Sequence, residues 1–375
     1  MVHSKKYLFC VIISALFLSL VFAGHCYAQS GQCLIVSDLH FNPFFDGKHN
    51  IDTNLRNELT TSDTLEWERL LGDHIAANPL DSNSRGYDSN FYLLRSAIDA
   101  MGAKVPHPAF IVIAGDFIWH AWYRKERSND TVLFDKNIPG QEQTLKTKSI
   151  QFIAYLFHKK FPGVPVIPAL GNNDSDNGDY TVGSTGFLNS FATAWKLNKP
   201  GEITADLSRF DTAGYYTAAR GNLKFVVLNS TLVKRGAVQF HSRGINMMQW
   251  LGTELSGSKN VWIISHIPPG KNGFDGGDMW DTSNGNPLNM FIDSITKHPD
   301  VVKLIIASHT HFNDFKVITT KNNTPVTYMR IVPSIGMDHR NNPSFEVADF
   351  DNAGRIAEET TFYLNIPDTN TKYSA

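Results

Sequence analysis

The sequence predicts an α/β fold with a largely parallel central sheet, and three observations lead to this prediction. Short apolar runs rich in β-branched residues recur along the chain between turn residues, as buried central strands do. Segments with apolar residues three and four positions apart lie between several of these runs, which is typical of amphipathic helices. Of the 375 residues, 42% are hydrophobic and 19% are charged, a composition that can form a globular core.

The first 28 residues have the pattern of an export signal. Lys5 and Lys6 precede an apolar stretch over residues 7–23, and small and polar residues follow it. This order predicts a secretory signal peptide cleaved after Ala28. A retained membrane anchor is the alternative, because the apolar stretch is just at the short limit for a span. We expect cleavage, release outside the cell or into a periplasm, and one catalytic domain over residues 29–375 without a transmembrane span.

The elements can be assigned in chain order. Helical patterns cover residues 92–101, 149–158 and 246–255, whereas residues 45–89 and 271–287 are polar and turn-rich and predict surface insertions. Beyond His311 the pattern predicts an antiparallel sheet that closes the domain, with runs at residues 315–320, 326–331, 344–350 and 356–364. The strands of the central sheet are predicted at residues 34–36, 110–113, 164–167, 225–228, 261–264 and 304–306.

Charge and cysteine content exclude some classes of protein. The chain has 34 Lys and Arg against 36 Asp and Glu, a net charge of -2, and no long run of like charges. A protein that coats nucleic acid is therefore not expected. After cleavage Cys33 would be the one remaining cysteine, so no intrachain disulfide is expected.

Metal-binding residue types directly follow five of the predicted strands. In an α/β sheet, ligands bind outside the carboxyl ends of strands, so these clusters can converge on one site. Taken singly, most of these residues could be helix caps, turn formers or structural histidines. Gly72-Asp73-His74 has the same residue types but follows a helical pattern, and we interpret it as a helix end. The candidate ligands are Asp38, His40, Asp116, Asn172, His266, His309 and His311.

Seven nitrogen and oxygen ligands are too many for one tetrahedral ion but fit two transition metals that share a carboxylate. Paired metals roughly 3.5 to 4 Å apart can clamp a phosphoryl group and lower the pKa of a bound water. The pattern therefore favours phosphoester hydrolysis.

In order and spacing, this series resembles the calcineurin-like metallophosphoesterases. Finer features resemble their acid sphingomyelinase-like branch: residues 266–270, residues 309–315, Asn342 to Phe345, and His120 four residues after Asp116. The resemblance implies a four-layer α/β/β/α sandwich and a binuclear centre, with Zn²⁺ expected and Mn²⁺ or iron as alternatives. It also implies that one metal is held by Asp38, His40 and His311, the other by Asn172, His266 and His309, and that Asp116 bridges them.

One departure from the family pattern concerns the mechanism. The family usually has a histidine at the position of Asn173, and an amide cannot deliver a proton. We therefore assign the general-acid role to His120 and place Asn173 near the phosphate, with a phosphate-positioning or packing role for His120 as the alternative. Nearby, Trp119 either stacks on a substrate group or lies in the core.

The leading interpretation is an exported phosphodiesterase in which a metal-bound hydroxide attacks phosphorus. We expect a monomer that acts on a small phosphoester or a phospholipid head group. Endopolyphosphatase or nucleotide phosphatase activity is the runner-up, because endopolyphosphatases share the form of residues 171–174; the best basic cluster for a polyanion is Arg124 to Arg127. A scaffold that binds phospho-ligands without catalysis is the alternative from another class.

Overall fold

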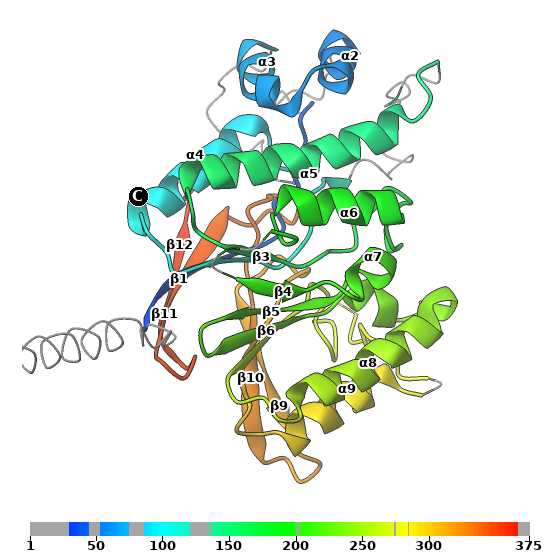
Figure 1. Cartoon of the computed structure of the whole chain (residues 1–375), viewed down its shortest axis with the longest axis vertical. Coiled ribbons are helices and arrows are strands. Elements are labelled where there is room, and N and C mark those ends of the chain that lie inside the picture. Colours follow the sequence, from blue (N-terminus) through cyan, green and yellow to red (C-terminus); the bar gives the residue numbers. More distant parts are fainter. Residues whose placement is uncertain are drawn as a thin grey trace, which may run out of the picture.

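The computed structural model describes residues 30–44, 53–74, 86–120, 134, 137–199, 201, 203–273, 275–283 and 285–366. Two mixed β-sheets pack face to face, and helices cover both outer faces (Figure 1). The predicted four-layer α/β/β/α architecture is therefore confirmed. The predicted signal peptide, the basic cluster at residues 124–127 and both cysteines before Cys33 lie outside the described residues.

The first sheet has five strands in the order β12-β11-β1-β2-β3. Strands β1, β2 and β3 run parallel, and β11 pairs antiparallel with both β1 and β12. Every residue of β2 and β3 is buried, as expected for short strands between two layers. The strands are β1 (Gly31–Val36), β2 (Ile111–Ile113), β3 (Val166–Pro168), β11 (Ser344–Phe350) and β12 (Ile356–Tyr363).

The second sheet has seven strands in the order β4-β5-β6-β7-β8-β10-β9. Its centre, from β6 to β10, is parallel, and antiparallel strands flank it on both sides. The strands are β4 (Thr204–Asp206), β5 (Tyr216–Arg220), β6 (Leu223–Val227), β7 (Val261–Ile264), β8 (Val302–Ala307), β9 (Asp314–Thr319) and β10 (Pro325–Ile331).

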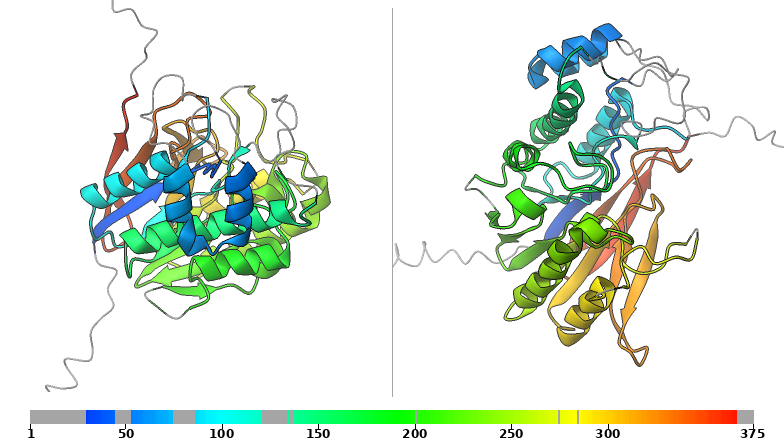
Figure 2. Two further views of the ribbon diagram at one scale, coloured as in Figure 1. Left: turned by 90° about the horizontal axis from the view of Figure 1, so that it is seen from above. Right: turned by 90° about the vertical axis from the view of Figure 1, so that its right-hand side faces the viewer.

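The helices lie on the two outer faces and at one end (Figures 1 and 2). Helices α4 (Phe91–Lys104), α5 (Gln141–Lys160) and α6 (Thr185–Ala194) lie on the side of the five-stranded sheet, and α8 (His241–Leu255) and α9 (Pro287–Lys297) lie on the side of the seven-stranded sheet. The short helices are α2 (Thr53–Thr61), α3 (Trp67–His74) and α7 (Phe210–Ala213), with 3₁₀ turns η1 (Thr64–Glu66), η4 (Ser230–Val233) and η5 (Val238–Phe240).

The structure departs from two expectations about the elements and confirms a third. The prediction that residues 45–89 are turn-rich is wrong for residues 53–61, because α2 forms there with Leu55 and Leu59 buried. Helix α3 ends at His74, as predicted for the segment Gly72-Asp73-His74. The C-terminal strands do not form one closing sheet: β9 and β10 extend the seven-stranded sheet, whereas β11 and β12 extend the five-stranded sheet.

The interior is closely packed with aromatic and aliphatic side chains from both sheets. Phe110 of the first sheet contacts Phe225 and Trp262 of the second edge to face, with ring centroids 5.0 and 5.4 Å apart. Cys33 is buried and free, so this core does not depend on a disulfide. Within the described residues, no helix is long and apolar enough to cross a membrane.

Candidate metal centre

The five predicted ligand clusters meet where the carboxyl ends of the two sheets adjoin. Asp38, Asp116 and Asn172 follow β1, β2 and β3 of one sheet, whereas His266 and His309 follow β7 and β8 of the other. A hydrogen bond of 2.7 Å from Ser37 Oγ to Ser308 Oγ joins the ends of β1 and β8 directly. The clusters are thus brought together by the sheet topology, as the strand-end argument predicted.

The backbone at these positions has an unusual conformation. Five candidate ligands have φ between 39° and 70°: Asp38, His40, Asp116, His309 and His311. They are half of the ten non-glycine residues with positive φ in the part of the chain that the structure describes. Such angles cost free energy and persist where the surrounding fold requires a particular side-chain direction, as at functional sites.

Two groups of potential ligands share one carboxylate. In each group the ligand atoms lie within 4.8 Å of one another: Asp38, His40 and Asp116 form the first, and Asp116, His266 and His309 form the second. His311 adjoins the first group, since its Nε2 lies 3.3 Å from Asp38 Oδ1. Asp116 is therefore placed between two potential metal positions.

Asn172 adjoins the second group through its amide oxygen. Oδ1 of Asn172 lies 3.1 Å from Nε2 of His266, and Nδ2 donates a hydrogen bond of 2.8 Å to Asp179 Oδ1. The bond to Asp179 orients the amide so that its oxygen faces the cluster. All seven candidate ligands are thus in one place.

The chemistry of this donor set fits bound cations. The Nδ1 atoms of His40 and His266 lie 3.1 and 2.9 Å from the carbonyl oxygens of Ile118 and Ala114, which can only accept, so each Nδ1 carries the hydrogen. The Nε2 lone pairs then face the cluster, where Asp116 Oδ2 lies 3.1 Å from Nε2 of His266. In addition, Asp38 Oδ1 is buried and receives no hydrogen bond from any described residue. Lone pairs that face one another in this way are stabilised by a proton or a metal ion between them, and this mixed nitrogen and oxygen donor set fits a transition metal.

The electrostatics of the cluster agree with this conclusion. Burial alone would raise the pKa of Asp38, but the charges of His311 and His266 lower it well below its usual value. Burial would lower the pKa of His266, yet Asp116 and Asp38 raise it to about 9. Burial and the charge of His266 lower the pKa of His309 to about 3. Burial would also raise the pKa of Asp116, but the charge of His266 lowers it well below its usual value. Asp38 and Asp116 are therefore ionised at neutral pH and attract a proton or a metal ion, and a metal that binds displaces protons.

Two carboxylates that the sequence analysis did not assign support the ligands from behind. Asp338, in the loop after β10, lies 2.9 Å from Nδ1 of His311 through its Oδ1. Asp174 accepts hydrogen bonds of 2.8 Å from the backbone N–H groups of Asp116 and Gly171 and thereby joins the ends of β2 and β3. Such outer partners orient metal ligands. Asp174 was recognisable from its motif, but no local pattern distinguishes Asp338.

Two glycines allow the segments after β2 and β3 to approach each other closely. A Cβ atom on Gly171 would lie 2.0 Å from Asp116 Oδ1, and one on Gly115 would lie 2.7 Å from the backbone N of Gly171. Gly115 also has φ of +97°, which side chains rarely adopt. Both glycines are therefore required by close packing around Asp116.

His120 and Asn173 occupy different positions. His120 lies beside the cluster, with its ring stacked on His40 at a centroid distance of 3.8 Å and its Nδ1 3.0 Å from Asp88 Oδ1. Asn173 is buried, and its backbone N–H and side-chain amide donate hydrogen bonds of 2.9 and 2.8 Å to Asp116. These contacts direct Asn173 to the carboxylate of Asp116 rather than to the predicted position near the phosphate.

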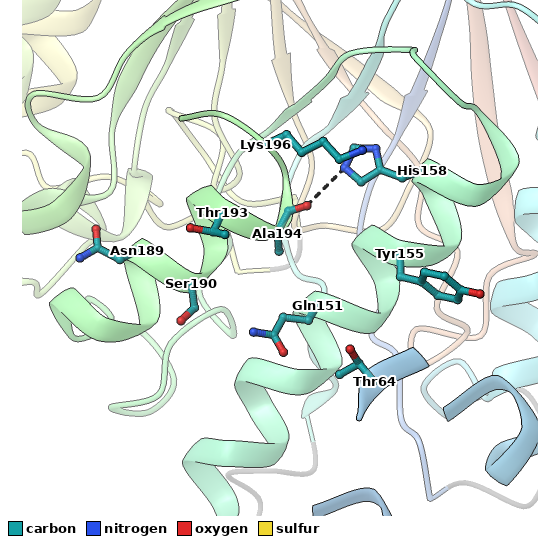
Figure 3. Close-up of a pocket in the computed structure, with 9 residues that line it drawn as sticks. All are labelled: Thr64, Gln151, Tyr155, His158, Asn189, Ser190, Thr193, Ala194 and Lys196. Atoms are coloured by element: carbon teal, nitrogen blue, oxygen red, sulfur yellow. Dashed lines mark hydrogen bonds between the residues drawn. The ribbon is translucent and has the colours of Figure 1, made fainter. Parts of the chain in front are cut away.

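Other features near the predicted site are structural. Trp119 is fully buried and packs edge to face on Phe44 at 5.6 Å, so it belongs to the core. A cavity of about 560 Å³ lies between α5 and α6, away from the ligand cluster (Figure 3). His158 and Lys196 line it, but none of the candidate ligands does. In this cavity, Nε2 of His158 lies 3.2 Å from the carbonyl oxygen of Ala194, so the histidine links α5 to α6 and has a structural role.

The comparison with known proteins now identifies the family. A family model described as calcineurin-like phosphoesterase matches residues 32–313. The chain belongs to this family. The family assignment and the names of the relatives together identify the chain as a metal-dependent phosphoric ester hydrolase, which confirms the predicted enzyme class.

Several curated proteins match most of the chain. Human cyclic GMP-AMP phosphodiesterase SMPDL3A is 25% identical over 91% of this chain and 72% of its own length. Human acid sphingomyelinase-like phosphodiesterase 3b is 23% identical over 93% of this chain and 74% of its own length. Sphingomyelin phosphodiesterase A of Dictyostelium discoideum is 24% identical over 91% and 54%, respectively. These names confirm the resemblance to the acid sphingomyelinase-like branch and support a phosphodiesterase of that type.

Among solved structures, purple acid phosphatase PPD1 from yellow lupin seeds matches 90% of this chain and 54% of its own. Its sequence identity is 10% and its TM-score is 0.44.

Proposed function

We propose that the chain is an exported phosphodiesterase that uses two divalent metal ions, with Zn²⁺ as the first candidate and Mn²⁺ or iron as alternatives. The observation that carries this proposal is the position of Asp116, whose carboxylate belongs to both ligand groups. A shared carboxylate between two sets of nitrogen and oxygen donors suits a pair of ions that clamp one phosphoryl group.

The proposal assigns each ligand to one ion. Asp38, His40 and His311 hold the first ion, and Asp116 contributes to both. The second ion is held by Asn172, His266 and His309. When bound, the ions supply a hydroxide derived from water as the nucleophile and neutralise the phosphoryl oxygens.

His120 is the proposed general acid of the reaction. Asp88 Oδ1 lies 3.0 Å from its Nδ1, so Asp88 orients the ring. The Nε2 atom is then available to deliver a proton to the leaving oxygen. Asn173 is a positioning residue in this proposal, because its two N–H groups hold the carboxylate of Asp116.

Export and a monomeric state complete the proposal. Residues 1–28 carry the pattern of a signal peptide that supports export. Sequencing of the amino terminus of the secreted protein tests cleavage after Ala28, and light scattering tests the monomer.

The test of the activity uses the purified protein with two substrates, bis-(p-nitrophenyl) phosphate and p-nitrophenyl phosphate. We expect preferential hydrolysis of the diester, loss of activity with a chelator, and recovery on addition of Zn²⁺, Mn²⁺ or Fe²⁺. Preferential hydrolysis of the monoester would contradict the diesterase assignment. Diester hydrolysis that survives thorough chelation would contradict the metal-dependent mechanism.

A further inference from the structure

A small cavity adjoins the metal-ligand cluster, because His309 lines both. Its volume of about 190 Å³ is below the roughly 300 to 1,000 Å³ of pockets that hold drug-sized ligands, so it suits a small group rather than a nucleobase or an acyl chain. Tyr180, Lys234, Arg235, Asn272 and Asp278 also line it. The chemical character of these side chains indicates what the cavity binds.

Among the residues that the structure describes, one cation at this cavity has no carboxylate partner. Arg235 Nη2 lies 3.2 Å from Asp275 Oδ2, and Lys271 Nζ lies 2.9 Å from Asp278 Oδ2, so these four charges neutralise one another. For Lys234, no carboxylate lies within 4 Å among the described residues. The cavity therefore carries a net positive charge next to the candidate metal centre.

The backbone holds Lys234 in a defined place. Lys234 forms a β-bridge with Trp280, and the neighbouring N–H of Arg235 donates a hydrogen bond of 2.8 Å to the carbonyl of Met279. Trp280 is fully buried, and its Nε1 donates a hydrogen bond of 2.8 Å to the carbonyl of Ile267, the residue after His266. Lys234 is thus attached, through Trp280, to the segment that carries a candidate metal ligand.

Tyr180 connects the cation to the ligand cluster. Lys234 Nζ lies 4.5 Å from the centroid of the Tyr180 ring, and the hydroxyl of the same ring lies 3.4 Å from Nε2 of His309. A cation–π contact explains part of the position of Lys234. It does not neutralise the charge, so the ammonium group keeps its capacity to donate hydrogen bonds to an anion.

We propose that this cavity binds a second anionic group of the substrate and that Lys234 recognises it. The inference rests on the proposed function and refines it: the preferred substrate is a phosphodiester with a further phosphate or carboxylate close to the scissile phosphorus. A substrate with a cationic head group such as choline is disfavoured, because Lys234 repels it.

The test compares three small probes that differ in one substituent, titrated by calorimetry into the metal-loaded full-length protein. Ethyl phosphate has no second charge, 2-phosphoglycolate has a second anion, and phosphocholine has a cation. We expect 2-phosphoglycolate to bind about 10- to 100-fold more tightly than ethyl phosphate, and phosphocholine to bind more weakly than both. In Lys234→Met the three affinities become similar, whereas Lys234→Arg keeps the order.

Controls separate charge recognition from other effects. Lys259→Met removes an exposed lysine on the loop before β7, at the opposite end of that strand from His266, and keeps the wild-type order of affinities. The melting temperature and the metal content of Lys234→Met, each compared with the wild-type value, show whether the variant is folded.

Two results would overturn the inference: equal affinities for 2-phosphoglycolate and ethyl phosphate in the wild type, or a preference that Lys234→Met leaves unchanged. Absence of diester hydrolysis in the wild type would instead count against the proposed function. The binding measurement still decides the role of Lys234 in that case, because it does not depend on turnover.

Discussion

Oδ1 of Asp338 lies 2.9 Å from Nδ1 of His311, on the opposite side of the imidazole from the nitrogen that faces Asp38. The negative charge of the carboxylate so close to the ring makes its other nitrogen a stronger donor to a metal. Asp338 also lies 3.5 Å from Nδ1 of His120 through its second oxygen. One acidic side chain thus supports both a candidate ligand and the candidate general acid.

We expect Asp338→Asn to weaken Zn²⁺ affinity by about 10- to 100-fold, because the amide no longer supports His311 electrostatically. Competition with a chromophoric chelator measures this change. Asp300→Asn, at an exposed position before β8, is the control with the same change of charge and should bind metal normally. Equal metal affinity in Asp338→Asn and wild type would contradict the role of Asp338.

Gly171→Ala tests the close packing around Asp116. The new Cβ would lie 2.0 Å from Asp116 Oδ1, so the carboxylate has to move. Because displacement of a catalytic group by about 1 Å can cost roughly 100-fold in rate, we expect diesterase activity to fall by at least about that factor. Gly72→Ala in α3, where nothing lies within 4 Å of the new atom, keeps full activity. Normal activity of Gly171→Ala would show that the approach of these segments is not required.

The general-acid assignment predicts a dependence on the leaving group. We expect His120→Ala to lose about 100- to 10,000-fold in kcat with alkyl esters, whose leaving groups need a proton, but much less with nitrophenyl esters. Asp88→Asn should show the same trend more weakly, because Asp88 acts through His120. A series of diesters with leaving groups of different pKa provides the measurement. An equal proportional loss across the series would rule out proton donation by His120.

Much of the site could be predicted from the sequence, because most candidate ligands directly follow a strand that its own apolar residues reveal. Asp38, Asp116 and His266 come directly after buried strands, so the strand pattern itself places them at the carboxyl edge. Asp338 and Lys234 could not be found in this way. Asp338 reaches His311 from the loop after β10, and Lys234 reaches the cavity through a bridge to Trp280, contacts that no sequence period encodes.

For the fold too, local elements could be predicted from the sequence, but pairings between distant segments could not. The short parallel strands at the centre of each sheet were predictable from their apolar runs. The division of the C-terminal strands between the two sheets was not. Strand β11 pairs with β1 at the other end of the chain, whereas β10 pairs with its near neighbours β8 and β9. Helix α2 was missed because its few apolar residues form a narrow stripe within a polar segment.

Glu346 of β11 makes stability depend on pH outside the metal centre. Burial raises the pKa of Glu346 to about 7 despite its ion pair with Arg330, so the folded protein favours the protonated form. The free energy of unfolding should therefore be highest below about pH 4.5 with respect to this group, decrease as pH rises to about 7, and stay level above. The difference amounts to at most about 3 kcal/mol.

Denaturant unfolding of wild type and Glu346→Gln between pH 5 and 8 measures this contribution, since groups far from Glu346 titrate alike in both proteins. The variant should lack the part of the slope that Glu346 causes. Parallel curves for the two proteins would contradict the raised pKa.

The central claim is that two metal ions share Asp116, and elemental analysis of the purified protein tests it most directly. The measurement determines metal per chain in wild type and in Asp116→Asn, together with hydrolysis of bis-(p-nitrophenyl) phosphate. We predict about two ions per chain in the wild type, as two-metal phosphoesterases require, and loss of metal and of diesterase activity in the variant. A wild-type protein that binds no metal or a single ion at saturation, or an Asp116→Asn variant with full metal content and activity, would contradict the account.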